Sequence, residues 1–184
     1  IAAHAGETTI DSTEALAAAL NAWVREVRDV DLRPVYGPTV PATPGAWYFF
    51  TSPATGSACK RLNLFLRWMV RNDGVDPGGW TSISPAALVV PLDTHTMRLG
   101  RCLRLTRRVS PGWKMAIDIT RGLREFDAAD PVRYDFALCH LGMMGGCGWG
   151  TDKGNAACPL REACKPAKPR ATRVGQRCGR RRAD

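Results

Sequence analysis

The stretch "GSACKRLNLFLRWMV", Gly56 to Val70, predicts the helix around which the rest of the chain is organised. We expect it to begin near Ser57 and to bury one apolar face. That face comprises Leu62, Phe65, Leu66, Met69 and Val70. The opposite, solvent-facing side carries Lys60, Asn63, Arg67 and Arg71. Lys60 lies in the first turn, so it is either a solvated helix end or an amine kept for chemistry.

Capping signals predict four further helices. A capping-box-like start at 11–14 precedes an apolar face. Its members are Leu16, Leu20, Trp23, Val24 and Val27. A helix should begin at Asp93 or Thr94, and others at the pairs Ser110-Pro111 and Asp130-Pro131, where proline suits the first turn. No segment alternates with period two, so we expect an all-α fold.

Two connectors separate the predicted helices. Residues 32–55 hold five prolines, which favour a long surface loop with one apolar anchor, "AWYFF". The stretch "NDGVDPGGWTSISP" is dense in turn formers and is expected to be an insertion between two helices. A chain of 184 residues fits one well-buried domain.

Positive charge is concentrated at the end of the chain. Of the formal charge of +9, residues 165–184 contribute +7, because they hold eight Lys or Arg against one Asp. We expect this tail to be disordered and to act on a polyanionic partner or as an electrostatic tether. No apolar run of 18 residues and no leader pattern is visible, so the sequence predicts a cytoplasmic protein without membrane association.

Seven cysteines in a reducing compartment argue against a disulfide framework. Some should be buried as small apolar groups and others are candidates for metal binding. Asp93 and His95 have a simple structural interpretation, since aspartate is a favoured N-cap and His95 lies one turn into the same helix. Spacing alone does not give either residue a chemical role.

Three stretches together resemble a known family: "GSACKRLNLFLRWMVR", "PLDTHTMRLGRCLRLTRR" and "DPVRYDFALCHLGM". They are similar to an uncharacterised bacterial family regarded as distant kin of the helix-hairpin-helix DNA glycosylases and endonuclease III. The resemblance covers Pro53 to Cys147. It implies a helix-hairpin-helix glycosylase-like domain, which divides the chain into an N-terminal helix and connector (1–55), a helical core with the active site (56–146), a cysteine loop (147–164) and the tail (165–184).

The resemblance implies catalytic roles for Lys60 and Asp93. In that superfamily a lysine at the start of a helix attacks the sugar, and an aspartate in a "VDTH"-like motif lies opposite. Their separation of 33 residues looks more like the archaeal 8-oxoguanine glycosylases than endonuclease III. The chain departs from that superfamily in one respect: the hairpin signature Leu-Pro-Gly-Val-Gly is absent, and "SPATGSACK" stands in its place.

Action on a duplex requires phosphate contacts and a pocket for an extruded base. The candidate DNA-binding residues are Gly56, Ser57, Asn63, Arg67, His95, Arg98 and Arg101. Trp47, Trp68 and Trp80 are candidates for stacking on a base, although a core position is favoured for Trp68 and is an equal alternative for Trp80.

The cysteine loop resembles the cluster-binding loop of endonuclease III. "CPLREAC" repeats the gap between the last two ligands of its iron-sulfur cluster, and Cys147 precedes it. Four thiolates are normally needed. With Cys147, Cys158 and Cys164 as three, the fourth is Cys178, Cys139 or a non-thiolate group. A 4Fe-4S cluster is preferred over zinc, and binding of neither is the third alternative. Cys139, Cys59 and Cys102 are predicted to be packing residues.

These observations favour a monomeric, nucleoid-associated DNA-binding protein of base excision repair, a DNA glycosylase and AP lyase acting through a lysine Schiff base. If it is monofunctional, Asp93 assists water instead. The alternative is a non-catalytic DNA-binding module with a structural metal or iron-sulfur site. A third interpretation is a chain that lacks part of its site.

Overall fold

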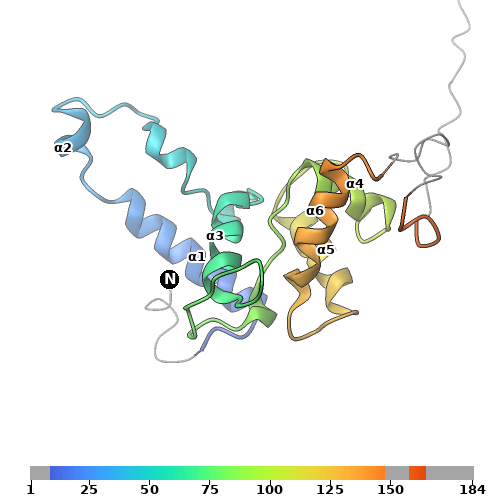
Figure 1. The fold of residues 1–184 in the computed structure, drawn as a ribbon. Coiled ribbons are helices and arrows are strands. Elements are labelled where there is room, and N and C mark those ends of the chain that lie inside the picture. Colours follow the sequence, from blue (N-terminus) through green and yellow to red (C-terminus); the bar gives the residue numbers. More distant parts are fainter. Residues whose placement is uncertain (1–8, 148–157, 165–184) are drawn as a thin grey trace, which may run out of the picture.

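In a computed structural model, residues 9–147 and 158–164 are described, and they form an all-α arrangement (Figure 1). The α-helices are α1 Thr13–Arg28, α2 Arg33–Tyr36, α3 Lys60–Val70, α4 Thr94–Cys102, α5 Trp113–Arg124 and α6 Asp135–Met143. Short 3-10 helices are η2 Gly45–Tyr48, η3 Pro53–Thr55, η4 Pro85–Ala87 and η5 Pro131–Tyr134. The all-α prediction is confirmed for this part of the chain, and the finer helix-hairpin-helix glycosylase fold stays a prediction.

The predicted first helix is α1. Ser12 is its N-cap, and the Ser12 hydroxyl oxygen accepts the Ala15 amide at 3.2 Å. Leu16, Leu20 and Val24 are buried as predicted. Beyond α1 the connector runs out to α2, which lies far from the other helices and buries none of its residues (Figure 1). The connector is thus largely exposed, as its prolines predict.

The "AWYFF" anchor is only partly buried. Phe50 packs edge-on against Trp23 with 5.6 Å between ring centroids. Tyr48 and Phe49 are exposed instead, and the Arg61 guanidinium lies 4.1 Å from the Tyr48 ring centroid. Arg28 of α1 also lies 5.7 Å from the Trp47 ring centroid and donates to the Phe50 carbonyl oxygen at 2.9 Å. The anchor therefore holds the connector to α1 through Trp47 and Phe50 rather than through the whole motif.

The prediction of an exposed polar face on α3 was wrong for three of its four residues, and Lys60 alone of the four is exposed. Leu62, Leu66 and Val70 are buried as expected. Asn63, Arg67 and Arg71 are buried too, with exposed fractions of 1%, 5% and 6%. Phe65 and Trp68, at 41% and 43%, are exposed in their place. These faces were predicted from polarity alone. In the structure, acidic residues from elsewhere in the chain pair with the two arginines, so the arginines are buried.

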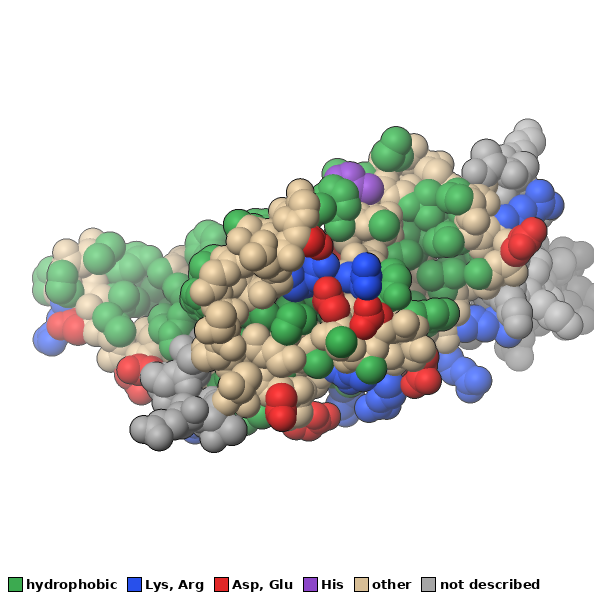
Figure 2. All heavy atoms as spheres, turned by 60° about the horizontal axis from the view of Figure 1, so that its bottom comes forward, with side chains coloured by type: hydrophobic (Ala, Val, Ile, Leu, Met, Phe, Trp, Pro, Cys, Tyr) green, Lys and Arg blue, Asp and Glu red, His purple; other side chains and the backbone are tan. Residues whose placement is uncertain are grey.

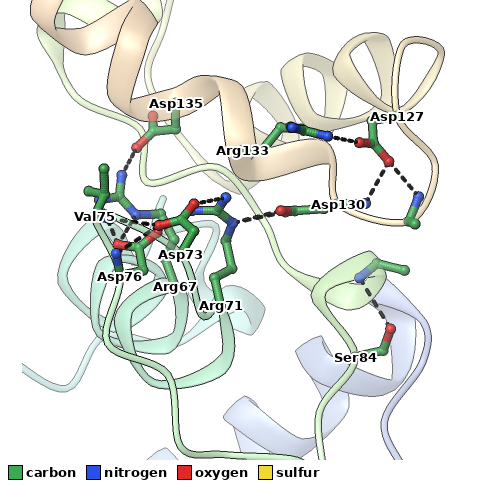
Figure 3. A network of polar contacts seen from close by, with 12 residues as sticks. Arg67, Arg71, Asp73, Val75, Asp76, Ser84, Asp127, Asp130, Arg133 and Asp135 are labelled. Carbon is green, nitrogen blue, oxygen red and sulfur yellow. Dashed lines mark hydrogen bonds and ion pairs between the residues drawn. The ribbon is translucent and has the colours of Figure 1, made fainter.

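Those partners form a buried ion-pair network (Figure 3). Arg67 pairs with Asp135 at 2.6 Å and with Asp76 at 3.1 Å. Arg71 also pairs with Asp76 and reaches Asp130 at 2.8 Å. Asp76 lies in the turn-rich stretch after α3, so this stretch folds back onto the helix rather than looping away. The network joins α3 to α6, 68 positions later in the chain.

The segment 88–92 runs extended through the core between η4 and α4. Leu88, Val89, Val90 and Leu92 are buried in it. The Val90 amide donates to the hydroxyl oxygen of Thr120 on α5 at 3.0 Å. A side chain of α5 thus satisfies a backbone donor that a strand would give to a neighbouring strand.

Two predicted helix starts are shifted. α5 begins at Trp113 rather than at Ser110-Pro111, and the Trp113 amide donates to the Gly56 carbonyl oxygen at 2.9 Å. The Asp130-Pro131 pair begins η5, and α6 follows directly. None of the helices in the described residues has the length and apolar character needed to cross a bilayer. The predicted disordered tail lies outside the described residues.

Candidate functional site

Lys60 and Asp93 lie in one neighbourhood at the start of α3 and α4. Lys60 is the first residue of α3 and is exposed. Before it, Gly56 and Cys59 have the left-handed φ values 78° and 49°, and the Ser57 hydroxyl oxygen accepts the Cys59 amide at 3.2 Å. The positive charge of Lys60 acts on Asp93. This effect on the Asp93 pKa is the smallest of those that act on it, and it is the link between the two residues that the motifs selected.

Both carboxylate oxygens of Asp93 accept hydrogen bonds. Oδ1 accepts the Thr96 amide at 2.7 Å, which makes Asp93 the N-cap of α4. Oδ2 accepts the Cys139 thiol at 3.1 Å. Burial raises the pKa of Asp93, but the Thr96 amide, the Cys139 thiol and the Lys60 charge outweigh it and leave the pKa below its ordinary value. Asp93 is thus a fixed, ionised carboxylate.

Cys139 is the residue of this site that sequence reasoning missed. It was assigned to the core, yet it is half-buried on α6 and donates to Asp93. Burial, followed by the Asp93 carboxylate, raises the pKa of Cys139 to about 12, and the Lys60 charge acts in the opposite direction. Cys139 therefore stays a thiol and a hydrogen-bond donor. No local sequence signal pointed to this role, because Asp93 lies 46 positions away on another helix.

A second carboxyl group, that of Asp135, is connected to Asp93 through Thr96, which hydrogen-bonds to both. It is buried, it pairs with Arg67, and its Oδ1 accepts the Thr96 hydroxyl at 3.3 Å. Burial raises the pKa of Asp135 to about 6, with the Asp93 charge acting in the same direction and Arg67 against it. The two carboxyl groups therefore have pKa values pushed apart, a pattern common where acid and base chemistry meet.

The predicted DNA-binding residues divide into an exposed and an interior group. Gly56, Arg98 and Arg101 are exposed, and Ser57 and His95 are half-buried. Asn63 is buried and donates to the Ala58 carbonyl oxygen at 3.1 Å, while Arg67 belongs to the ion-pair network. The side chains of Asn63 and Arg67 are buried, so neither is available to a phosphate in this structure.

His95 packs where α4 meets α6. A Cβ built on Gly142 of α6 would lie 2.7 Å from the His95 Cβ. This close approach of the two helices carries Cys139 to Asp93.

The tryptophans lie at or near the surface. Trp68 is 43% exposed, against the favoured core position. Trp80 is half-buried and meets Phe65 edge-on at 5.6 Å between centroids, and Trp47 is half-buried beneath the Arg28 guanidinium, 5.7 Å from its ring centroid. Of these three tryptophans, Trp68 is therefore the most open to a ligand.

The cysteine loop is partly described. Cys147 and Cys158 are buried and Cys164 is half-buried, whereas Cys178 lies outside the described residues. Cys102, at the end of α4, lies within interaction range of the Cys164 and Cys147 thiols. Burial, followed by these two thiols, raises the pKa of Cys102 to about 12. None of the described cysteines forms a disulfide, and no three His, Cys, Asp or Glu side chains within 9–147 and 158–164 could hold a metal ion together.

Comparison with known families gives a match over residues 6–144, which includes Lys60, Asp93 and Cys139. The chain belongs to the family described as "Protein of unknown function (DUF2400)". No curated protein and no solved structure matches the chain. The DUF2400 match covers the three stretches from which the resemblance was drawn, but its description gives no activity and does not link the chain to the glycosylases.

Proposed function

We propose that this protein is a DNA glycosylase and AP lyase of base excision repair, with Lys60 as the nucleophile and Asp93 as the assisting carboxylate. The observation that carries the proposal is that an exposed lysine begins α3 and a fixed carboxylate caps α4, with the lysine charge near enough to lower the pKa of that carboxylate. Two segments 33 positions apart supply these groups. An amine beside a general base is the arrangement that imine chemistry requires.

In the bifunctional reaction the Lys60 amine attacks the anomeric carbon of the nucleotide. The carbon–nitrogen bond to the base breaks, a new carbon–nitrogen bond to Lys60 forms, and the base leaves with its bonding electrons and takes up a proton. Asp93 accepts the proton that the amine loses and stabilises positive charge on the sugar. The sugar ring then opens, because the C1′–O4′ bond breaks and O4′ takes up a proton, which leaves an imine between C1′ and Lys60. Loss of a proton from C2′ of this imine expels the 3′ phosphate by elimination. In the monofunctional alternative Asp93 assists water instead.

The surface around the site suits a phosphate backbone. Arg98 and Arg101 are exposed on α4, the helix that Asp93 begins. The hydrogen bond from the Trp113 amide to the Gly56 carbonyl brings the N-terminus of α5 beside the turn that leads into α3. Helix N-termini attract anions. On the face drawn in Figure 2, Lys and Arg side chains lie at the centre and along the lower edge, with Asp and Glu side chains beside them in both places.

The second candidate function is a DNA-binding module without catalysis. Its supporting observation is the N-cap hydrogen bond, since capping α4 is by itself a sufficient reason for an aspartate at position 93. In that case Lys60 contributes only positive charge to the surface.

Borohydride trapping separates the two functions. The full chain is mixed with duplexes carrying 8-oxoguanine, uracil or an abasic site, and covalent adducts are counted after reduction. The matched control is Lys114→Ala, because Lys114 is also exposed and also lies in the first turn of a helix, α5. Asp93→Asn keeps an oxygen for the cap and removes the charge.

We expect an adduct in the wild type and in Lys114→Ala, no adduct in Lys60→Ala, and at least about tenfold slower formation in Asp93→Asn. An adduct that persists in Lys60→Ala contradicts the assignment of the nucleophile. Salt-sensitive DNA binding with no adduct in any variant favours the binding module.

A further inference from the structure

The exposed side of α3 carries aromatic and basic side chains. Lys60 and Arg61 are exposed in its first turn, and Phe65 and Trp68 are exposed further along the helix. Arg61, Phe65 and Trp68 follow one another at spacings of four and three residues, so they share one side of the helix. Grouped exposed apolar side chains commonly mark an interaction surface.

Two further exposed rings come from the connector and are joined to the same side of α3. Tyr48 and Phe49 are exposed. The Arg61 guanidinium lies 4.1 Å from the Tyr48 ring centroid and 5.6 Å from that of Phe49, and it donates to the Tyr48 hydroxyl oxygen at 2.6 Å. Arg61 therefore holds the connector rings against the first turn of α3. We call the surface formed by Tyr48, Phe49, Arg61, Phe65 and Trp68 the aromatic face.

The chain after α3 supports the aromatic face at Phe65. The Gly78 amide donates to the Trp68 carbonyl oxygen at 2.9 Å, and the Trp80 amide donates to that of Met69 at 2.8 Å. These hydrogen bonds bring Trp80 beside Phe65, where the two rings meet edge-on with 5.6 Å between centroids. A ring held in this way loses little conformational entropy when a ligand stacks on it.

The charge of this part of the chain is positive. Residues 32–72 contain five Lys or Arg and no Asp or Glu. The acidic residues that flank this stretch, Asp31 and Asp73, each pair with an arginine. A ligand with flat rings and negative charge is complementary to such a surface. A second copy docked through the same face would instead place positive charges opposite each other, which is unfavourable.

We propose that the aromatic face binds unpaired nucleotides of single-stranded DNA, with bases stacking on Phe65 and Trp68 and phosphates beside Lys60 and Arg61. Every base has a flat π-face, so aromatic side chains with neighbouring cations hold a strand without reading its sequence. From Lys60 to Trp68 the helix rises about 12 Å, the length of about three nucleotides. The inference rests on the proposed function in taking DNA as the ligand, and it adds that the strand beside the reacting nucleotide is held unpaired.

Binding of undamaged single strands to the full chain tests the inference. A labelled oligothymidylate of about 15 nucleotides is compared, by fluorescence anisotropy, with a propanediol-phosphate strand of equal length, which keeps the phosphates but has neither sugar nor base. We expect the wild type to bind oligothymidylate at least about fivefold more tightly. Trp68→Ala should lose at least about fivefold in affinity for oligothymidylate and keep its affinity for the other strand. Trp68→Phe retains a ring and should lose less.

The matched control is Phe126→Ala, because Phe126 is also an exposed aromatic residue but lies after α5, outside the aromatic face. It should bind both strands as the wild type does. Equal wild-type affinity for the two strands overturns the inference, as does wild-type affinity of Trp68→Ala for oligothymidylate or an equal loss on both strands. Self-association that depends on Trp68, with neither strand bound, assigns the face to a second copy and also overturns it.

These outcomes are separate from those of borohydride trapping, because the two strands carry no damaged or abasic nucleotide. Preferential binding of oligothymidylate without any adduct removes the glycosylase activity and keeps the aromatic face as a DNA-binding surface. Adducts at Lys60 together with equal binding of the two strands keep the activity and remove the aromatic face.

Discussion

The Asp135 carboxyl group should make the protein less stable as the pH rises through the mildly acidic range. Asp135 is buried beside Arg67 and near the charge of Asp93, and burial raises its pKa from 3.8 to about 6. Below pH 3.8 the group is protonated in the folded and the unfolded state. Between these two values the unfolded chain has released the proton while the folded protein retains it, so folding stability falls as the pH rises.

The magnitude follows from the size of the shift. One pKa unit corresponds to about 1.4 kcal/mol, so the rise at Asp135 corresponds to a loss of about 3 kcal/mol of unfolding free energy between low pH and neutrality. Asp135 is almost fully buried, so solvent screening does not reduce this figure appreciably. Asp135→Asn removes the titration and keeps an oxygen that accepts from Arg67.

Urea unfolding of wild type and Asp135→Asn over about pH 4 to 7.5 measures the effect. The unfolding free energy of the wild type minus that of Asp135→Asn should fall by about 3 kcal/mol with rising pH and level off above about pH 6.5. Asp127→Asn is the control. Arg133 lowers the pKa of Asp127, so the stabilising contribution of this carboxylate is lost only below pH 3.8. The difference in unfolding free energy between wild type and Asp127→Asn should therefore be flat in this range. A flat or rising difference for Asp135→Asn would refute the reasoning.

Two further predictions concern packing and charge. Arg67→Ala leaves two buried carboxylates short of a partner and should cost about 3–5 kcal/mol of unfolding free energy, whereas Arg33→Ala, in an exposed ion pair, should leave it unchanged. Gly142→Ala places a Cβ 2.7 Å from His95 and should cost about 1–3 kcal/mol, while Gly74→Ala, with open space around it, should be neutral. Urea denaturation measures all four; equal losses within either pair contradict the respective argument.

The helices follow from local signals in the sequence. Ser12 and Asp93 cap α1 and α4 as their residue types favour, and Pro131 begins the turn that leads into α6. Apolar spacing correctly identified the buried residues of α1 and the core leucines of α3. These features depend on residues within about one turn of each other, so no tertiary information was needed.

The orientation of α3 could not be predicted in this way. Polarity favoured exposure of Arg67, but its partners Asp76 and Asp135 lie 9 and 68 positions away. Whether an arginine is buried depends on whether a carboxylate meets it, and periodicity contains no information about that. Wherever distant partners decide burial, the sequence pattern alone gives the wrong face.

The same distinction between local sequence and tertiary structure applies to the candidate site residues. The sequence determined the α-helical class and the concentration of positive charge at 165–184, because each is a property of residue type and local spacing. The choice of Lys60 and Asp93 came from the resemblance to a known family, not from their spacing. The tertiary structure decided that Cys139 hydrogen-bonds to Asp93. A thiol looks the same in sequence whether it fills the core or faces a carboxylate, and only the packing of α4 against α6 distinguishes these roles.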